Sequence, residues 1–355
     1  MDILKTITDL SHEFGSEKYV RGGGGNTSCK DENSLWVKPS GTTLASLTES
    51  SFVQIDRAKL SALYKIEPPA DSSGREALVK NIMQEAVVPG SAGRPSVEAP
   101  LHDSLNATFV VHTHPALVNG LTCSKDGAAV CGKLFPDALW LDYIDPGYTL
   151  CMRVREEIER YKTSHGNEPK LIFLKNHGLF VSACVPEEIE ELYGKVISAL
   201  KAEYDAAGIS TSLEIAPAPE AEKLMEAEKL IREAFADSGL CVTASGSFQY
   251  AEGPISPDHI VYSKSFPFTG RPSAVGIESF KSEKGYLPQV VAFDGMVFGV
   301  ASNPKSAALA LELAQDGALV MKLAAAFGGV EFLAESSREF IENWEVESYR
   351  KKQME

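Results

Sequence analysis

The sequence has no long apolar run and no excess of basic residues. No stretch approaches the roughly 20 apolar residues of a transmembrane helix, and the first residues have no apolar signal core. Lys and Arg number 34 against 49 Asp and Glu, which gives a net charge of −15. This charge argues against sequence-independent binding to nucleic acid or to an anionic membrane. We therefore expect a cytoplasmic protein that binds neither.

Closely spaced cysteines are also lacking. The six cysteines include no Cys-x-x-Cys pair, so they predict neither a disulfide framework nor a cysteine zinc site. We expect isolated, reduced thiols at Cys29, Cys123, Cys131, Cys151, Cys184 and Cys241. A composition of 44% hydrophobic and 23% charged residues is that of an ordinary globular protein. At 355 residues, the chain exceeds what one core usually supports, which favours two domains.

A segment rich in Ser, Thr, Ala and Pro at 209–220 is typical of a linker. It divides the chain into a first domain at 1–208 and a second α/β domain at 221–355. Residues 179–186 (LFVSACVP) and 297–304 (VFGVASNP) resemble each other. Each segment follows a predicted apolar strand and precedes a predicted helix. We interpret the second domain as a degenerate repeat without metal ligands, because Gly295 stands opposite His177. Chance similarity of two short units is the alternative.

Hydrophobic spacing predicts the elements of the first domain. Apolar residues recur at helical spacing through 150–161, and the helix should end near Gly166. A second helix should begin at Pro186, since proline suits the first helical position. Runs at 34–38, 171–174 and 179–184 predict strands. The region 67–95 is rich in Pro, Ser and Gly around one helical stretch at 75–85, and we expect an exposed excursion there.

Three histidines indicate a metal site. His112 and His114 end the apolar run 107–111, and residues two apart on a strand point to the same face. His177 lies in a tight Asn-His-Gly turn between two strands, where its ring can be aimed sideways. Three imidazoles with an open fourth position form the ligand set of a catalytic zinc, whereas structural zinc sites are closed and usually contain cysteine. The sequence therefore predicts a metalloenzyme.

Four ordered segments resemble the class II aldolase and adducin family: 22–28 (GGGGNTS), 35–44 (LWVKPSGTTL), 95–114 (PSVEAPLHDSLNATFVVHTH) and 171–180 (LIFLKNHGLF). Together they cover residues 1 to about 205. The run 95–102 is most similar to the aldolase part of bifunctional rhamnulose 1-phosphate aldolase and dehydrogenase proteins. The resemblance implies a three-layer α/β domain with a central, mostly antiparallel sheet, followed here by the smaller α/β domain. It also implies a homo-oligomer, a tetramer in the family.

The resemblance assigns roles to individual residues. Zn²⁺ would be bound by His112, His114 and His177, and Glu98 would be the catalytic base. Such a pair suits proton abstraction next to a carbonyl, because a Lewis acid stabilises the enediolate while a carboxylate takes the proton. The substrate's phosphate would bind backbone amides and small polar side chains. The family's phosphate residues correspond to Gly25, Asn26, Ser40, Gly41 and Ser96.

The chain departs from the family at several positions. Val97 replaces the second serine before the glutamate, which removes a phosphate donor. The stretch 129–141 has no tyrosine to protonate the leaving group, and Tyr143 and Tyr148 only lie near it in sequence. His102, four residues after Glu98, is either a proton relay or second-layer group, or a packing histidine.

The favoured activity is zinc-dependent cleavage of a ketose 1-phosphate, similar to rhamnulose or fuculose 1-phosphate, into dihydroxyacetone phosphate and an aldehyde. One alternative is a sugar-phosphate epimerase or a sugar-acid phosphate decarboxylase at the same zinc site. The other is a non-catalytic interaction module of the adducin kind. A nicotinamide site is not expected at the four glycines 22–25, because they open into a strand instead of a helix.

Overall fold

The computed structural model describes residues 2–69, 71–91 and 93–344. The chain forms two compact units. The first comprises Met1–Val118 and Gly127–Leu200, and the second comprises Asn119–Asp126 and Lys201–Glu355. The second unit thus takes in a short segment from the middle of the first 200 residues. Residues 209–220 contain no helix or strand.

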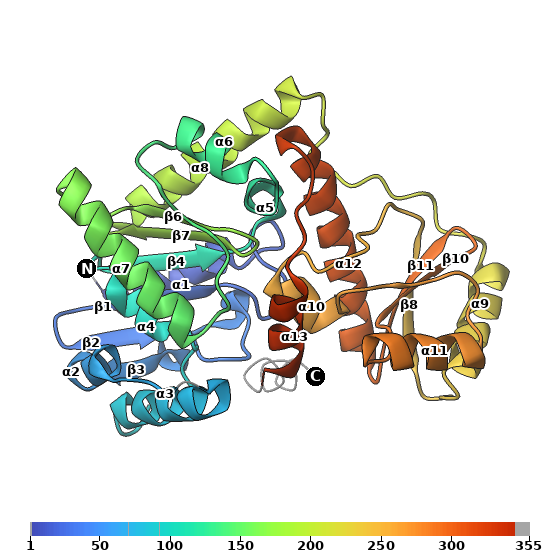
Figure 1. Cartoon of the computed structure of the whole chain (residues 1–355), viewed down its shortest axis with the longest axis horizontal. Helices are drawn as coiled ribbons and strands as arrows, with labels where there is room; N and C mark the ends of the chain where they lie inside the picture. Colours follow the sequence, from blue (N-terminus) through green and yellow to red (C-terminus); the bar gives the residue numbers. More distant parts are fainter. Residues whose placement is uncertain (1, 70, 92, 345–355) are drawn as a thin grey trace. The chain divides into compact units, whose positions relative to one another are not determined.

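The first unit is built on a seven-stranded sheet (Figure 1) with the order β3-β2-β1-β4-β7-β6-β5. All neighbouring strands are antiparallel except β5 and β6, which are parallel. This arrangement confirms the prediction of an α/β domain with a mostly antiparallel sheet. The strands are β1 (Asn26–Lys30), β2 (Ser34–Val37), β3 (Val53–Asp56), β4 (Phe109–Thr113), β5 (Leu139–Leu141), β6 (Leu171–Leu174) and β7 (Gly178–Ala183).

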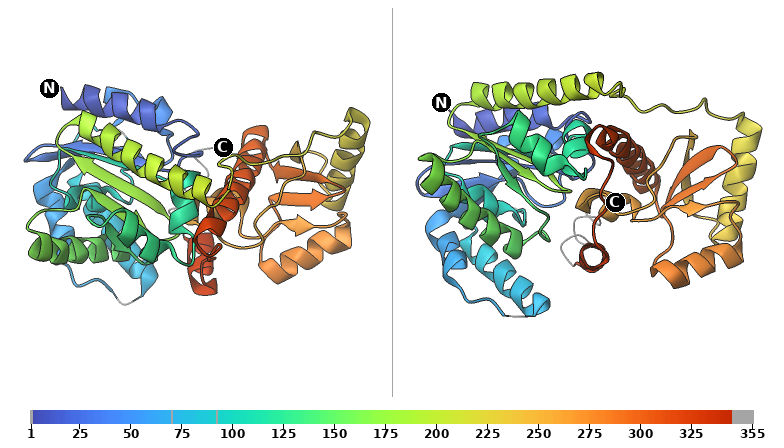
Figure 2. Two further views of the ribbon diagram at one scale, coloured as in Figure 1. Left: turned by 90° about the horizontal axis from the view of Figure 1, so that it is seen from above. Right: turned by 45° about the horizontal axis from the view of Figure 1, so that its top comes forward.

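Helices cover both faces of this sheet (Figure 2). On one face α1 lies against β1 and β4, and α8 reaches β4 through a hydrogen bond from Tyr193. On the other face α4 and α7 share an apolar cluster with β4, β6 and β7. The α-helices are α1 (Ile3–Phe14), α2 (Arg57–Leu60), α3 (Ser72–Ala86), α4 (Ala99–Ser104), α6 (Gly127–Leu134), α7 (Tyr148–His165) and α8 (Pro186–Ala206), with 3-10 turns η1 (Leu44–Ser46), η2 (Glu49–Ser51) and η3 (Ser61–Lys65).

Helix α7 shows why the hydrophobic spacing was informative. Leu150, Val154, Ile158 and Tyr161 recur every three or four residues and are all buried. Each such side chain contributes about 1.5–3 kcal/mol when it leaves water. Gly166 ends the helix with a φ of 76°, a left-handed conformation that glycine adopts without strain. The predicted helix and its end are confirmed, as is the helix that begins at Pro186.

The expectation of an exposed excursion at 67–95 is wrong for its helix. Val79, Met83 and Ala86 of α3 are buried in a cluster with β2 and β3. Their spacing of four and three places them on one face. The many Ser, Gly and Pro residues around them concealed this face, because only three well-buried positions carry it.

The second unit contains a four-stranded sheet with the order β8-β11-β10-β9. The segment Asn119–Asp126 belongs to this unit, and Ser124 forms a β-bridge with Val330. The prediction of a smaller second α/β domain is confirmed. The elements are β8 (Cys241–Gly246), β9 (Phe268–Thr269), β10 (Val290–Phe293), β11 (Met296–Ala301), α9 (Ala221–Ala234), α10 (Pro257–Ser263), α11 (Ala274–Lys284), α12 (Pro304–Ala324), η4 (Ala325–Phe327) and α13 (Glu335–Asn343), with α5 (Ala116–Thr122) leading into the segment from β4.

The two sheets share a pairing scheme. β8 is antiparallel to β11, β11 is antiparallel to β10, and β10 is parallel to β9. The same sequence of pairings joins β4, β7, β6 and β5. The tight turns also agree, since Asn176 and Asp294 both have a φ near 50°. The degenerate repeat remains a prediction that these likenesses support.

None of the described helices is both long and apolar enough to cross a membrane.

Candidate metal centre

The site is built around β4, a central strand of the first unit. Its residues Phe109–Thr113 are all buried between β1 and β7. His112 is fully buried and pairs with Asn26 on one side and Phe180 on the other. His114 follows the end of the strand, and its amide donates to the carbonyl of Tyr19. The alternation of side chains turns both imidazoles to one face.

His177 reaches the same point from the turn between β6 and β7. Asn176 has a φ of 52°, a left-handed conformation that asparagine tolerates better than most residues. Gly178 follows, and a Cβ there would lie 2.5 Å from the carbonyl oxygen of Thr113 and 2.7 Å from Cδ2 of His114. Only glycine therefore allows the turn to approach β4 so closely. The Asn-His-Gly sequence thus places the third imidazole beside the first two.

The three rings converge on one point. The Nε2 atoms of His112 and His114 are 2.9 Å apart, and those of His112 and His177 are 3.4 Å apart. One ligand atom from each ring lies within 4.8 Å of the others. Zinc binds imidazole nitrogens at about 2.0–2.1 Å, so a single ion can contact all three. In the described part of the chain, no other group of three such ligands lies this close.

The orientation of His112 is fixed from behind. Its Nδ1 lies 3.0 Å from the carbonyl oxygen of Leu179 and can only donate there. This contact puts the proton on Nδ1 and leaves the lone pair of Nε2 for a metal. The ring also stacks on Phe180, with centroids 3.7 Å apart and an interplanar angle of 11°. Strand β7 therefore sets both the tautomer and the plane of this imidazole.

Glu98 faces the three histidines from the start of α4. Its Oε1 atom is 3.5 Å from Nε2 of both His112 and His177, and the residue is 8% exposed. Its other oxygen, Oε2, accepts a hydrogen bond from the side-chain amide of Asn26. A buried carboxylate in this position can either bind the metal or exchange a proton with a substrate carbon bound at it.

The residues predicted to bind phosphate lie on three segments, and these are tied together by backbone contacts. The amide of Ser40 donates to Arg94, and the amide of Ser96 donates to the carbonyl of Lys38. Lys38 is 2% exposed, and its Nζ donates to Gly23 at 3.4 Å and Thr42 at 2.8 Å. A buried cation therefore joins the glycine loop to the Ser-Gly turn. From the sequence, Lys38 fits the role of a strand surface residue as well as that of a phosphate ligand, because strand periodicity cannot reveal such contacts.

Gly25 and Gly41 both have positive φ values, of 67° and 80°. Asn26 directly follows Gly25 at the start of β1. The predicted loop residues thus adopt backbone conformations in which neighbouring amides can be presented to an anion. Their role in binding phosphate remains a prediction.

A family model described as the class II aldolase and adducin N-terminal domain matches residues 5–202. The chain belongs to this family. The match ends close to the boundary of the first unit, and all the residues of the candidate metal centre lie within it.

Two curated relatives resemble the aldolase domain. An L-fuculose phosphate aldolase of Methanocaldococcus jannaschii is 24% identical over 203 residues, which is 54% of this chain and 88% of the relative. The uncharacterized oxidoreductase YuxG of Bacillus subtilis is 26% identical over 209 residues, which is 56% of this chain and 28% of that protein. The chain therefore spans only about a quarter of the B. subtilis relative. Among solved structures, the N-terminal class II aldolase domain of a Thermoplasma acidophilum protein is 25% identical, with 57% and 93% of the chains covered and a TM-score of 0.49.

Two further features of the aldolase domain were open or unseen in the sequence. His102 is fully buried, and its Nδ1 lies 2.7 Å from Oγ of Ser28. Burial, with the positive charges of Lys30 and Lys38, lowers the pKa of this imidazole well below its usual value, so the ring is neutral. Tyr148 packs in an apolar cluster with β2 and β3, which favours a structural role over that of a proton donor.

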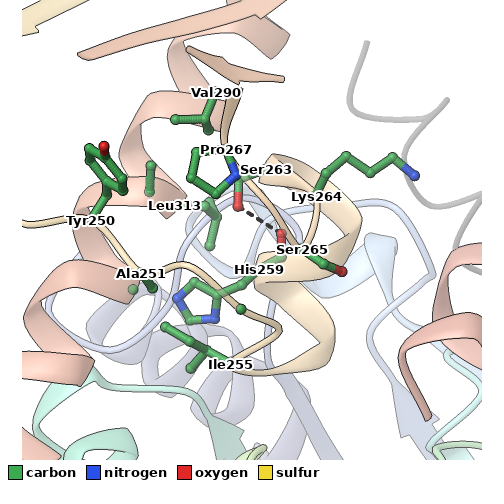
Figure 3. A pocket seen from close by; sticks show the side chains of 13 residues that line it. Tyr250, Ala251, Ile255, His259, Ser263, Lys264, Ser265, Pro267, Val290 and Leu313 are labelled. Carbon is green, nitrogen blue, oxygen red and sulfur yellow. Dashed lines mark hydrogen bonds between the residues drawn. The ribbon is translucent and has the colours of Figure 1, made fainter. Parts of the chain in front are cut away.

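A small cavity in the second unit is lined by Tyr250, His259, Pro267 and Leu313 among others (Figure 3). Its volume is about 30 Å³, which is enough for a water molecule but not for a sugar phosphate. His259 is held by Oγ of Ser256 at 2.7 Å and lies 3.3 Å from Asp316. These contacts hold the ring of a buried histidine at the start of α10.

Proposed function

We propose that the protein is a zinc-dependent aldolase that cleaves a ketose 1-phosphate, similar to rhamnulose or fuculose 1-phosphate, into dihydroxyacetone phosphate and an aldehyde. The observation that carries this proposal is the convergence of three Nε2 atoms with the Glu98 carboxylate 3.5 Å from two of them. The name of the M. jannaschii relative favours the same substrate class.

His112, His114 and His177 would hold Zn²⁺, which when bound supplies Lewis-acid stabilisation of the negative charge that develops on substrate oxygen. Cleavage begins as the C4 hydroxyl passes its proton to the Glu98 carboxylate. The electron pair of the C3–C4 bond then forms an enediolate, and the aldehyde leaves. Glu98 in its acid form returns a proton to C3, which completes dihydroxyacetone phosphate. In the synthetic direction the carboxylate removes that proton.

The phosphate end of the substrate would bind along Gly25, Asn26, Ser40, Gly41 and Ser96. Lys38 adds a buried positive charge that links two of these segments. That charge, and the backbone amides of the two glycines, compensate in part for the donor that Val97 lacks.

The test is a coupled assay for dihydroxyacetone phosphate across a panel of ketose 1-phosphates. The purified full chain is assayed as isolated, after chelation, and after reloading with Zn²⁺. We expect product from at least one member, lost on chelation and restored by Zn²⁺. A panel that yields no metal-dependent product would contradict the proposal.

A second candidate keeps the same enediolate chemistry but redirects it to epimerisation or decarboxylation. Two observations favour it: Val97 replaces a serine of the family pattern, and Tyr148 packs in an apolar cluster. NMR of the products would distinguish carbon–carbon cleavage from inversion and from loss of carbon dioxide. A non-catalytic adducin-like module is the weaker alternative, because it gives no reason for three converging imidazoles beside a buried carboxylate.

We further propose a homo-oligomer, with a tetramer as the family suggests, acting in the cytoplasm. Light scattering coupled to size exclusion measures the assembly directly, and a monomeric mass at assay concentrations would contradict it.

We also infer that the second unit is a degenerate copy of the strands that carry the metal site. Phe180 pairs with His112, and Phe298 pairs with Ala244. On this register the second unit has Ala244, Gly246 and Gly295 in place of the three histidines. The carbonyl oxygen of the linker residue Ala216 lies 1.9 Å from the position that a Cβ on Gly246 would take. We therefore expect one Zn²⁺ per chain and none in a variant in which His112, His114 and His177 are all changed to Ala. Retention of an ion by that variant would contradict the inference.

A further inference from the structure

Two polar contacts join strand β1 to helix α4. Asn26 and Ser28 are two residues apart on β1 and so share a face. Glu98 and His102 are four residues apart, one turn along the helix, and the amide of His102 donates to the carbonyl of Glu98. Asn26 Nδ2 donates to Glu98 Oε2, and Ser28 Oγ is 2.7 Å from His102 Nδ1. Strand β1 therefore contacts two successive points of the segment formed by Glu98 and α4.

The contact of Asn26 fixes the direction of the carboxylate. One oxygen of Glu98 is held by the amide, so the other faces the imidazole nitrogens of His112 and His177 at 3.5 Å. Asn26 is itself immobilised, because it is 7% exposed and pairs with His112 across β1 and β4. A carboxylate accepts but cannot donate, so the amide nitrogen must face Glu98. The Asn26 Oδ1 atom is buried and has no hydrogen-bond partner in the described structure.

We propose that Asn26 is a positioning residue that holds Glu98 beside the metal nitrogens, in addition to any contact with a substrate anion. This inference rests on the proposed metal site and deepens it. With Oε2 bonded to Asn26, the Oε1 atom faces two of the nitrogens that would hold Zn²⁺, so the carboxylate would be able to serve as a further ligand. Asn26 thus acts on the metal through Glu98, as outer groups that orient ligands do in other metal sites.

The test is a double-mutant cycle on metal affinity, measured by competition between the purified full chain and a chelator. Asn26→Ala should weaken Zn²⁺ binding about 10-fold, in the range found when a group that orients a ligand is removed. Glu98→Ala should weaken it at least as much. In the Glu98→Ala background, Asn26→Ala should weaken Zn²⁺ binding by less than a further factor of about two, because the effect of Asn26 passes through Glu98.

Ser28→Ala is the matched control. It removes one hydrogen bond from the same face of the same strand, but that bond goes to His102. We expect it to lower the thermal unfolding temperature while changing Zn²⁺ affinity less than about twofold, since the carboxylate keeps its partner. If Asn26→Ala does not fold, Asn26→Ser takes its place in the cycle.

Two results would overturn the proposal. One is a Zn²⁺ affinity that Asn26→Ala leaves unchanged, with only the affinity for inorganic phosphate reduced. The other is a loss of Zn²⁺ affinity on Asn26→Ala that is as large in the Glu98→Ala background as in the native chain. Failure of the aldolase proposal has a different signature: the native chain would bind Zn²⁺ with the expected cycle yet release no dihydroxyacetone phosphate. A native chain that binds no Zn²⁺ at all would overturn both proposals.

Discussion

Gly25 lies where the glycine loop and the candidate metal ligand His112 meet. Its φ is 67°, and an added Cβ would lie 2.7 Å from the carbonyl oxygen of His112 and from Cγ1 of Val20. Gly25→Ala should therefore lower the free energy of unfolding by about 2–5 kcal/mol through strain and overpacking together. It should also weaken Zn²⁺ binding, because the backbone of His112 must move.

Gly166 provides the control for this change. Its φ is 76°, but no atom lies within 4 Å of an added Cβ. Gly166→Ala should cost only the left-handed strain of about 1–2 kcal/mol and leave Zn²⁺ affinity unchanged. Chemical denaturation and chelator competition measure the two effects. Equal losses of stability in both variants would contradict the steric argument.

Glu98 is the residue on which the proposed chemistry depends most. Glu98→Gln keeps the size of the side chain and an oxygen for Asn26 but removes the proton acceptor. We expect kcat to fall about 10²- to 10⁴-fold, the range of general acid–base contributions. Exposed Glu156 on α7 offers a matched change, and Glu156→Gln should retain full activity. A Glu98→Gln variant with nearly native kcat would assign the base to another group.

The convergence of the three histidines was easier to predict from the sequence than the contacts around them. His112 and His114 could be found because alternation along a strand needs no knowledge of the rest of the fold. The contact between Asn26 and Glu98 joins positions 72 residues apart, and the stacking of Phe180 on His112 depends on the register of β7. Such contacts leave no periodic signal, so resemblance had to supply Glu98 as the base.

At the scale of elements, helix α8 supports β4 through one hydroxyl. Tyr193 OH lies 2.7 Å from Oγ1 of Thr113 and donates to the carbonyl of Val111 at 3.2 Å. Tyr193→Phe should lower the free energy of unfolding by about 1–3 kcal/mol, because it leaves a buried hydroxyl and carbonyl short of a partner. Zn²⁺ affinity should fall too, since Thr113 stands between His112 and His114.

Tyr161 serves as the comparison, because its hydroxyl donates to the carbonyl of Asp137 away from the histidines. Tyr161→Phe should cost some stability and leave Zn²⁺ affinity as it is. The same two measurements apply to both variants. A Tyr193→Phe protein that binds Zn²⁺ normally would limit α8 to a packing role.

Helices that bury several residues along one face could be predicted from the sequence. Elements that depend on pairing or packing with a neighbouring element could not. Helices α7 and α8 each bury four or more residues along one face, so periodicity located them. Strand β5 has three residues and exists by parallel pairing with β6. Helix α3 presents only a narrow buried face amid polar residues. In these cases the information lies in the neighbouring element.

At the scale of the whole molecule, Lys30 should shape the dependence of stability on pH. It is buried, its Nζ donates to the carbonyl of Ala107 at 2.8 Å, and burial lowers its pKa to about 7. Between pH 7 and its ordinary pKa of 10.5 the unfolded chain binds the extra proton, so stability should rise with pH in this window. The rise from pH 7 to pH 8.5 is on the order of 1 kcal/mol.

Lys30→Met removes the titrating group while keeping an unbranched chain. The difference in free energy of unfolding between the native chain and this variant, measured by urea denaturation from pH 7 to pH 8.5, isolates the contribution of Lys30. We expect the free energy of unfolding of the native chain to increase relative to that of the variant as pH rises. Parallel pH profiles would show that Lys30 has an ordinary pKa in the folded protein.

The division into units was only partly readable from sequence. Composition marked the irregular stretch at 209–220, but the segment Asn119–Asp126 joins the second unit through Ser124 and Val330, more than 200 residues apart. The amide of Lys125 likewise donates to Gly329. Contacts between segments so far apart in the sequence leave no local sequence pattern from which they could be predicted.

The order of the strands in the sheet has a consequence for synthesis. Strand β4 leaves the ribosome with His112, and His114 directly follows it. The neighbouring strand β7, with the preceding His177, comes only about 65 residues later. Until then His112 has neither the Leu179 carbonyl that sets its tautomer nor the Phe180 ring that holds its plane. Metal capture during translation should therefore wait for β7. Ribosome-bound chains halted before and after that strand should differ abruptly in Zn²⁺ retention.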